Sequence, residues 1–209
     1  MSPISKFVRV IIAVLAVGGG ATMVFLQLQG VRELPSHATV LPTPSPLPDF
    51  ALLDQSGNQF DQQSMRGQWS LVFFGFTHCP DICPATLQQL AIARSKVLAA
   101  DSGQGNSFPQ IILISVDPER DSTEVMREYV AHFDADIKGV SGDIEQLKIL
   151  TAALGIFFEK STDSAEDYNV AHSVVVLLIN PQAEFHALFS APHDVEHFVN
   201  DVPLLTGST

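Results

Sequence analysis

The chain has 209 residues, of which 46% are hydrophobic and 16% are charged, and its formal net charge is −12. This acidity argues against nucleic acid as a partner, because phosphate binding needs clustered cations. The hydrophobic fraction, which includes 14 Phe, is too high for a disordered chain. We therefore expect one globular domain, preceded by an N-terminal segment of different character.

That N-terminal segment has the pattern of a membrane anchor. Residues 10–28 carry no charge, and these 19 residues are close to the ~20 that cross a bilayer as a helix. Lys6 and Arg9 precede them and all 23 acidic residues follow, which predicts a cytoplasmic N-terminus and an exported domain. A cleaved signal peptide is the alternative, but no clear small-residue cleavage site follows Leu28. We expect residues 1–31 to form a single-pass anchor in the inner (plasma) membrane, with the domain on the periplasmic side.

Residues 32–48 are expected to form a proline-rich spacer. The stretch from Pro35 to Pro48 contains five prolines, counting both ends, and no charged residue. This composition favours extended polyproline II geometry, which suits a tether holding the domain off the membrane. A proline-rich ligand for a binding groove is the alternative. The domain itself is then predicted to span residues 49–209.

Strands and helices alternate through that domain, and a strand pair is expected near its end. The apolar runs at 69–76 and 111–116 lack alternation, which is typical of strands buried on both faces. The predicted elements are two short strands within 50–60, strand 69–76, helix 85–98, strand 111–116, a helix capped by Ser122 and ending near 133, helix 143–154, strands 173–180 and 184–189, and a last helix opened by Asp194. This order predicts an α/β thioredoxin-like fold, with a central mixed sheet flanked by helices.

The chain has two cysteines, Cys79 and Cys83, with three residues between them, directly after the first buried strand. A disulfide is the simple interpretation in an exported domain. However, a bridge closing so short a loop constrains the unfolded chain only weakly. Proline follows each cysteine, and Pro84 suits the first position of a helix. Cys83 should therefore lie at or beside a helix N-terminus, where free N–H groups and the helix dipole favour a thiolate.

Two such cysteines can exchange disulfides or bind a soft metal ion. Thioredoxin-type exchange usually uses two intervening residues rather than three. Tetrahedral structural zinc normally needs four protein ligands, and the chain has no second cysteine pair. Copper(I) accepts fewer and softer ligands, so two thiolates and one imidazole would be enough.

Seven histidines could supply the imidazole. His172 directly precedes the predicted strand 173–180, and in a thioredoxin-like topology the loop before this strand lies beside the cysteine loop. This makes His172 the best third ligand, with the mere capping of a strand as an equally good alternative. His78 adjoins Cys79, and a surface or supporting role suits it better than ligation. His193 and His197 are spaced as a helical metal pair, although exposed surface positions are the simpler interpretation.

Three motifs, in this order, resemble the Sco/SenC family of copper proteins. They are residues 77–84 (THCPDICP), 115–121 (SVDPERD) and 168–173 (YNVAHS). The resemblance spans the exported domain from about Pro48 to the last helix. It implies that Cys79, Cys83 and His172 bind one copper ion. It also implies delivery of copper to the dinuclear copper centre of cytochrome c oxidase subunit II, or reduction of the cysteines of that centre.

The chain departs from the family pattern at several positions. Ala171 stands where the family usually has Asp before the ligand histidine, so a carboxylate that could orient the imidazole is missing. Ala183 and Glu184 replace the usual glycine of a later turn. In the second motif, Asp117 is expected to shape the loop after its strand, with partner docking by Asp117 and Arg120 as the alternative.

Two functions follow from these observations, with cytochrome c oxidase and a thiol reductant protein as the partners. The first is a membrane-anchored copper chaperone that uses Cys79, Cys83 and His172. The second is a thiol–disulfide oxidoreductase acting on exported proteins, in which Cys79 attacks a disulfide and Cys83 resolves the mixed disulfide. A peroxidase is a weaker third alternative, because no arginine lies next to Cys79 in the sequence.

Overall fold

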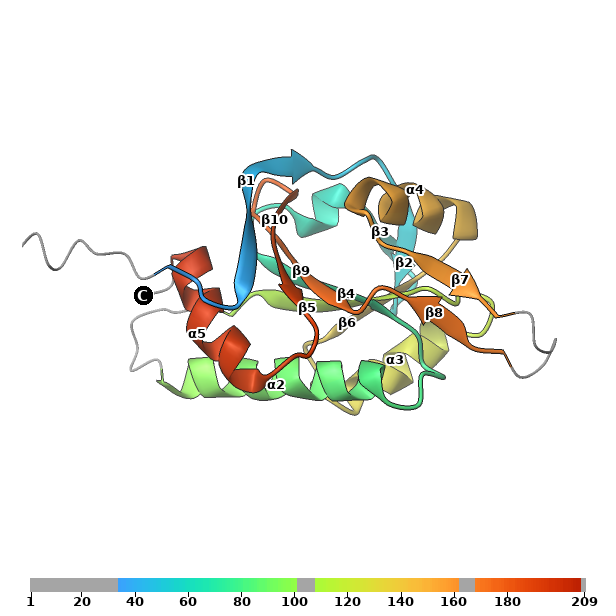
Figure 1. The fold of residues 1–209 in the computed structure, drawn as a ribbon. Coiled ribbons are helices and arrows are strands. Elements are labelled where there is room, and N and C mark those ends of the chain that lie inside the picture. Colours follow the sequence, from blue (N-terminus) through green and yellow to red (C-terminus); the bar gives the residue numbers. More distant parts are fainter. Residues whose placement is uncertain (1–33, 101–107, 162–167, 208–209) are drawn as a thin grey trace, which may run out of the picture. The chain divides into compact units, whose positions relative to one another are not determined.

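An eight-stranded mixed sheet is the centre of the computed structural model, which describes residues 34–100, 108–161 and 168–207 (Figure 1). Its strands lie in the order β1-β10-β9-β4-β5-β6-β2-β3. Their bounds are β1 (Ala38–Pro46), β2 (Leu52–Asp54), β3 (Gln59–Phe60), β4 (Ser70–Gly75), β5 (Gln110–Ser115), β6 (Lys138–Ser141), β9 (Val175–Ile179) and β10 (Glu184–Ser190). The neighbours β4, β5 and β6 run parallel, and the other neighbours are antiparallel. The predicted mixed α/β sheet is confirmed.

The two apolar runs form the central strands β4 and β5, as predicted. All six residues of β4 are buried, and five of the six in β5. The two strands pair in parallel from Ser70 opposite Gln110 to Gly75 opposite Ser115. Because they end in register, the loops after them leave the sheet side by side. These loops carry Cys79 and Asp117.

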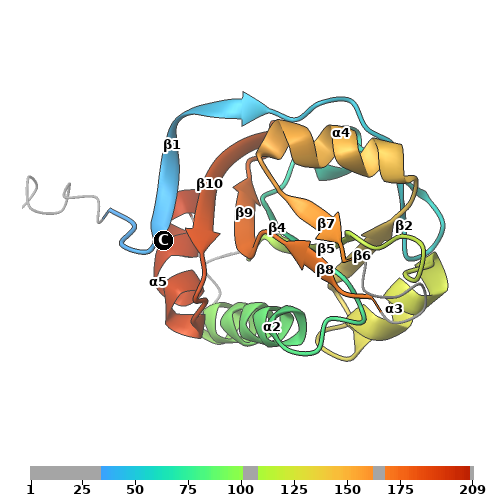
Figure 2. The same ribbon diagram turned by 45° about the vertical axis from the view of Figure 1, so that its right-hand side comes forward.

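Four helices of the described part of the chain cover the sheet, and Figures 1 and 2 show α4 on one side with α2 and α3 on the other. Their bounds are α2 (Ile82–Ala100), α3 (Thr123–Ala131), α4 (Ile144–Leu154) and α5 (Val195–Thr206), and a short 3-10 helix, η1, spans Gln62–Met65. Side chains of Ser122, Asp143 and Asp194 accept hydrogen bonds from backbone N–H groups in the first turns of α3, α4 and α5. These caps explain why helices begin where the sequence predicts them.

The segment predicted as a spacer is part of the sheet. Residues 38–46 form the edge strand β1, whose first residues Ala38 to Val40 pair with β10. The pairing resumes at Ser45 after a register shift, which accommodates the prolines between. An edge strand tolerates proline because its outer N–H groups need no partner. The structural unit accordingly begins at Pro35 and not near Asp49.

A second, two-stranded sheet lies outside the main one, and the sequence did not predict it. It is the antiparallel pair of β7 (Phe158–Lys160) and β8 (Val170–His172). His172 is therefore the last residue of a strand. The sequence analysis placed it in a loop, and that prediction is wrong. Each strand has only three residues, too few for an alternating pattern to be recognisable.

The predicted membrane anchor, residues 10–28, lies outside the described residues. Among the residues that the structure does describe, no helix is long and apolar enough to span a bilayer.

Candidate functional site

The two cysteines lie at the junction of the β4 loop and helix α2. The helix begins at Ile82, two residues before the expected Pro84, so Cys83 lies in its first turn. Cys83 is fully buried, Cys79 is 8% exposed, and both are free thiols. The backbone N–H of Cys83 donates to Cys79 Sγ at 3.4 Å. A sulfur atom thus accepts a hydrogen bond from an N–H group at the start of the helix. That sulfur belongs to Cys79 and not to Cys83, where the sequence favoured the thiolate.

The two thiols differ strongly in acidity. A hydrogen bond from the Cys83 thiol lowers the pKa of Cys79 to about 5, against the opposing effect of burial, and backbone N–H groups of Cys83 and Asp81 lower it further. The same thiol–thiol bond, together with burial, raises the pKa of Cys83. At neutral pH the pair therefore consists of a Cys79 thiolate beside a Cys83 thiol.

His172 comes to this pair from the end of β8. Its Nε2 lies 3.6 Å from Cys83 Sγ, although 89 residues separate the two in sequence. Its Nδ1 lies 3.0 Å from the carbonyl oxygen of Val170. A carbonyl only accepts hydrogen bonds, so Nδ1 carries the proton and the lone pair of Nε2 points to the sulfur side. The rings of Phe73 and Phe76 contact the imidazole edge-on, at 6.3 and 5.6 Å between centroids.

The backbone orients the ring without the carboxylate that Ala171 lacks. In the β7–β8 pairing Ala171 is opposite Glu159, and it is exposed. Successive side chains of a strand point to opposite faces, so position 171 and His172 point apart. The carbonyl oxygen of Val170 accepts a hydrogen bond from Nδ1 of His172. Metal-ligating histidines commonly make such a hydrogen bond with a supporting group.

These donors fit a soft metal ion in part. With metal–sulfur and metal–nitrogen bonds of about 2.3 and 2.0 Å and angles near 110–120°, sulfur and nitrogen would lie about 3.5–3.7 Å apart. The 3.6 Å between Cys83 Sγ and His172 Nε2 agrees with this separation. Within the described ranges, however, no three His, Cys, Asp or Glu side chains are already arranged to hold an ion together. Cys79 is adjacent but not in place as a third donor.

A groove gives access to the site from outside. It has a volume of about 280 Å³ and runs between the cysteine loop and β8. Its walls include Phe76, Cys79, Ile82 and His172. A partner could therefore reach Cys79 and His172 directly, whereas Cys83 lies beneath them.

A buried carboxylate, Asp121, supports the cysteine loop, and the sequence analysis did not assign it a role. It accepts hydrogen bonds from the backbone N–H of Thr77 at 3.0 Å and from its hydroxyl at 2.6 Å. The Ser115 hydroxyl donates to it at 2.6 Å. Asp121 thus ties the start of the cysteine loop to the end of β5. Its position at the end of the motif 115–121 was the sequence signal that could have identified it as part of the site.

The other histidine candidates lie apart from the cysteines or at the surface. His78 is exposed and its ring contacts the Thr77 hydroxyl. His193 is only 8% exposed, so the surface position expected for it is wrong; it packs beside Phe198. His197 stacks on His37 at 3.9 Å between ring centroids. Among the described histidines, only the ring of His172 therefore contacts the cysteine pair.

Comparison with known proteins identifies the family. Residues 41–206 match the sequence profile SCO1/SenC. The chain belongs to the SCO1/SenC family. A Stutzerimonas stutzeri protein, provisionally described as copper-binding, is 34% identical over 157 residues, which are 75% of each chain. The crystal structure of yeast Sco1 with copper bound has 30% identity and a TM-score of 0.71, and the match covers 79% of this chain and 91% of that one.

Mitochondrial members of the SCO1/SenC family are longer. Protein SCO1 homolog 1 of Arabidopsis thaliana is 34% identical over 155 residues, which are 73% of this chain. The match covers only 45% of the Arabidopsis protein, so this chain spans about half of its length.

Proposed function

We propose that this protein binds one copper ion through Cys79, Cys83 and His172 and passes it to a partner protein. The observation that carries the proposal is the 3.6 Å approach of His172 Nε2 to Cys83 Sγ. There the soft sulfur of Cys83, from the start of α2, meets the Nε2 lone pair of His172, from the end of β8. Both are donors that suit Cu(I). Copper in the related yeast Sco1 structure supports this choice of metal.

The two cysteines contribute differently to the copper site. Cys79 is already a thiolate at neutral pH and reaches the groove, so it is the donor that first meets an incoming ion. Cys83 must lose its proton when the ion binds, because thiolates and not thiols are metal ligands. Since the thiol–thiol hydrogen bond is lost at that step, Cys79 becomes free to shift toward His172 and complete the set of three donors.

Transfer to the partner requires only ligand exchange. The acceptor's thiolates enter along the groove and replace the protein's own donors one at a time. Cys83 Sγ takes a proton back from solvent as the copper leaves; no other covalent bond of this chain is made or broken, and no electron is transferred. A partly open site with two accessible donors, Cys79 and His172, suits release as well as capture.

The family resemblance points to cytochrome c oxidase as the acceptor, at its dinuclear copper centre. In this proposal residues 10–28 anchor the protein in the inner membrane, with the N-terminus in the cytoplasm and the domain on the periplasmic side. The unbroken apolar stretch and the positive charges before it support the orientation. A membrane anchor would hold the copper site near a membrane-bound acceptor and raise its effective concentration there.

The copper content of the full chain in detergent tests the copper proposal. The protein is reduced, loaded with Cu(I) without oxygen and compared with His172→Ala. We expect one copper per wild-type chain and a much weaker hold in the variant. His132→Ala is the matched control, because His132 is an exposed histidine at the end of α3 and should leave binding unchanged. Wild-type protein that retains no copper would refute the proposal.

The acidity of Cys79 favours one second function, thiol–disulfide exchange. The Cys79 thiolate would attack a disulfide sulfur of an exported protein and release that protein's first thiolate. Cys83, once deprotonated, would then attack Cys79 Sγ, form the Cys79–Cys83 disulfide and release the second thiolate. Two electrons pass from the pair to the substrate. Since this reaction needs no imidazole ligand, His172→Ala should leave exchange with a disulfide substrate intact while copper binding becomes much weaker.

A further inference from the structure

The hairpin of β7 and β8 carries His172 but lies outside the main sheet. Phe158 pairs with His172, and Lys160 pairs with Val170. Residues directly opposite each other, and those two apart in one strand, share a face of the ribbon. The hairpin therefore presents these four side chains on one inner face, and its position decides where His172 lies.

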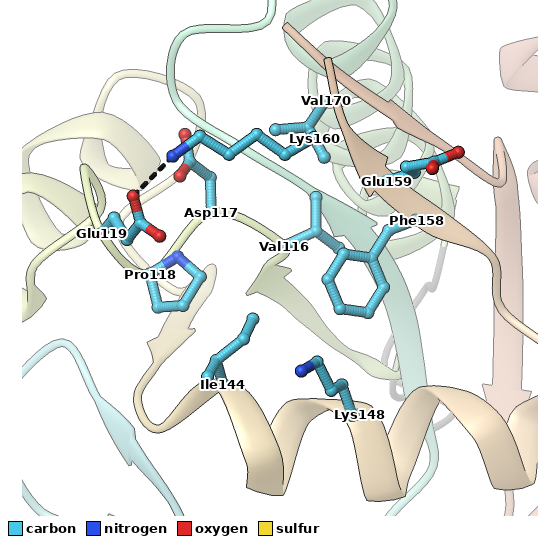
Figure 3. Close-up of a pocket in the computed structure, with 10 residues that line it drawn as sticks. All are labelled: Val116, Asp117, Pro118, Glu119, Ile144, Lys148, Phe158, Glu159, Lys160 and Val170. Carbon is cyan, nitrogen blue, oxygen red and sulfur yellow. Dashed lines mark hydrogen bonds and ion pairs between the residues drawn. The ribbon is translucent and has the colours of Figure 1, made fainter. Parts of the chain in front are cut away.

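Packing against α4 holds this inner face only in part. A cavity of about 330 Å³ separates it from α4, and Figure 3 shows Phe158 and Val170 on one side of the cavity with Ile144 and Lys148 on the other. Side chains across a cavity forgo the contacts that fix a well-packed element. Some other contact must hold the hairpin at the distance that His172 requires.

That contact begins at Tyr168, two residues before β8. Tyr168 is 7% exposed, and its hydroxyl donates to Asp117 Oδ1 at 2.7 Å. The other oxygen of Asp117 accepts from Nε of Arg120. Asp117 belongs to the loop after β5, which leaves the sheet beside the cysteine loop. The hydrogen bond therefore joins the hairpin to the frame that positions the cysteines.

Two cations complete the attachment. The guanidinium carbon of Arg120 lies 3.7 Å from the Tyr168 ring centroid and 5.8 Å from that of Phe76, which itself contacts His172. Lys160 Nζ lies 3.7 Å from the same Tyr168 ring and pairs with Glu119 at 2.7 Å. Figure 3 shows Lys160 extending from β7 to Glu119, with Asp117 close by. We call these five residues, Tyr168, Asp117, Arg120, Lys160 and Glu119, the tyrosine clasp.

We propose that Tyr168 is a positioning residue of the copper site: its bond to Asp117 holds the β7–β8 hairpin so that His172 Nε2 meets Cys83 Sγ. This inference rests on the proposed copper function for its consequence, but the positioning itself exists in the metal-free protein. Besides shaping its loop, Asp117 then holds the β7–β8 hairpin by accepting the hydrogen bond from Tyr168.

The decisive variant is Tyr168→Phe, which removes the hydroxyl and keeps the ring between its two cations. Tyr129→Phe is the matched control, since the described residues offer its buried hydroxyl no hydrogen-bond partner. In the full chain in detergent, we expect Tyr168→Phe to weaken copper binding about 10- to 100-fold, the range for residues that support a metal ligand. Tyr129→Phe should bind copper as the wild type does.

A second comparison separates positioning from a general loss of structure. In a His172→Ala background, where Cu(I) is held by the cysteines alone, Tyr168→Phe should cause no further loss of affinity. An equal loss in both backgrounds, or wild-type affinity in Tyr168→Phe, would overturn the inference.

A measurement without copper keeps the inference apart from the proposed function. Nuclear Overhauser contacts between the His172 ring and the Cys83 side chain should be present in the reduced wild type and in Tyr129→Phe. They should be lost in Tyr168→Phe. If the wild type bound no copper, the proposed function would be refuted, and these contacts would still test the positioning role of Tyr168. Contacts that persist in Tyr168→Phe would refute that positioning role.

Discussion

Gly75 leaves the space that the Cys83 thiol occupies. A methyl group at Gly75 would lie 3.0 Å from Cys83 Sγ and 2.9 Å from Cε1 of Phe73. Both distances are shorter than ordinary carbon and sulfur contacts. The last residue of β4 therefore decides how closely the start of α2 approaches the sheet, and through it where Cys83 lies relative to His172.

Gly75→Ala should thus lower both stability and copper affinity. We expect the free energy of unfolding to fall by about 1–3 kcal/mol, as for overpacking elsewhere in cores, measured by urea denaturation. Gly57→Ala is the control, since Gly57 has φ +80° in the turn after β2 with no atom within 4 Å of the added methyl. It should lose roughly 1 kcal/mol from backbone strain and retain full copper binding. Unchanged copper binding in Gly75→Ala would contradict this role.

The Cys79 thiolate should form at unusually low pH. With a pKa of about 5 in the folded protein against 9.0 for an ordinary cysteine, Cys79 stabilises the fold fully above pH 9. This contribution declines as pH falls toward 5 and is absent below it. Ultraviolet thiolate absorbance of the reduced protein should show a midpoint near pH 5. Cys83→Ala should move that midpoint upward, because the thiol hydrogen bond is removed; a wild-type midpoint near 9 would exclude the arrangement.

Asp121→Ala should destabilise the cysteine loop. It leaves the buried hydroxyl of Ser115 and the N–H of Thr77 without their acceptor, and each such loss costs about 1–3 kcal/mol. We expect the free energy of unfolding to drop by about 2–4 kcal/mol in urea titrations. Asp136→Ala, which breaks an exposed ion pair with Arg94, should cost less than about 1 kcal/mol. Equal losses in the two variants would show that Asp121 has no special structural role.

Asp201 should anchor the beginning of β1 to α5. Its carboxylate is 1% exposed and accepts hydrogen bonds from the backbone N–H groups of Ser36, His37 and Ala38. Asp201→Ala should accelerate amide hydrogen exchange at the start of β1 and lower stability by about 2–4 kcal/mol. Glu196→Gln, an exposed change on the same helix, should leave exchange in β1 unaltered. Slow exchange in Asp201→Ala would mean that pairing with β10 alone holds the strand.

Local sequence was sufficient for the elements whose signals lie within a few residues. The unbroken apolar runs predicted β4 and β5, because strands buried on both faces need apolar side chains at every position. Ser122, Asp143 and Asp194 marked the starts of α3, α4 and α5, since their side chains bond N–H groups two or three residues ahead. The proline that follows each cysteine likewise placed Cys83 at or beside a helix N-terminus, although the helix begins two residues earlier than expected.

Tertiary structure decided the features that depend on distant partners. Residues 38–46 read as a free spacer because proline content is a local property, whereas pairing with β10 comes from residues about 145 positions later. The β7–β8 hairpin and the bond from Tyr168 to Asp117, 51 residues apart, are equally absent from any local pattern. His172 could be nominated from its place before a strand and from family resemblance. Only the folded chain shows it beside Cys83, because that contact depends on the hairpin's attachment to the β5 loop.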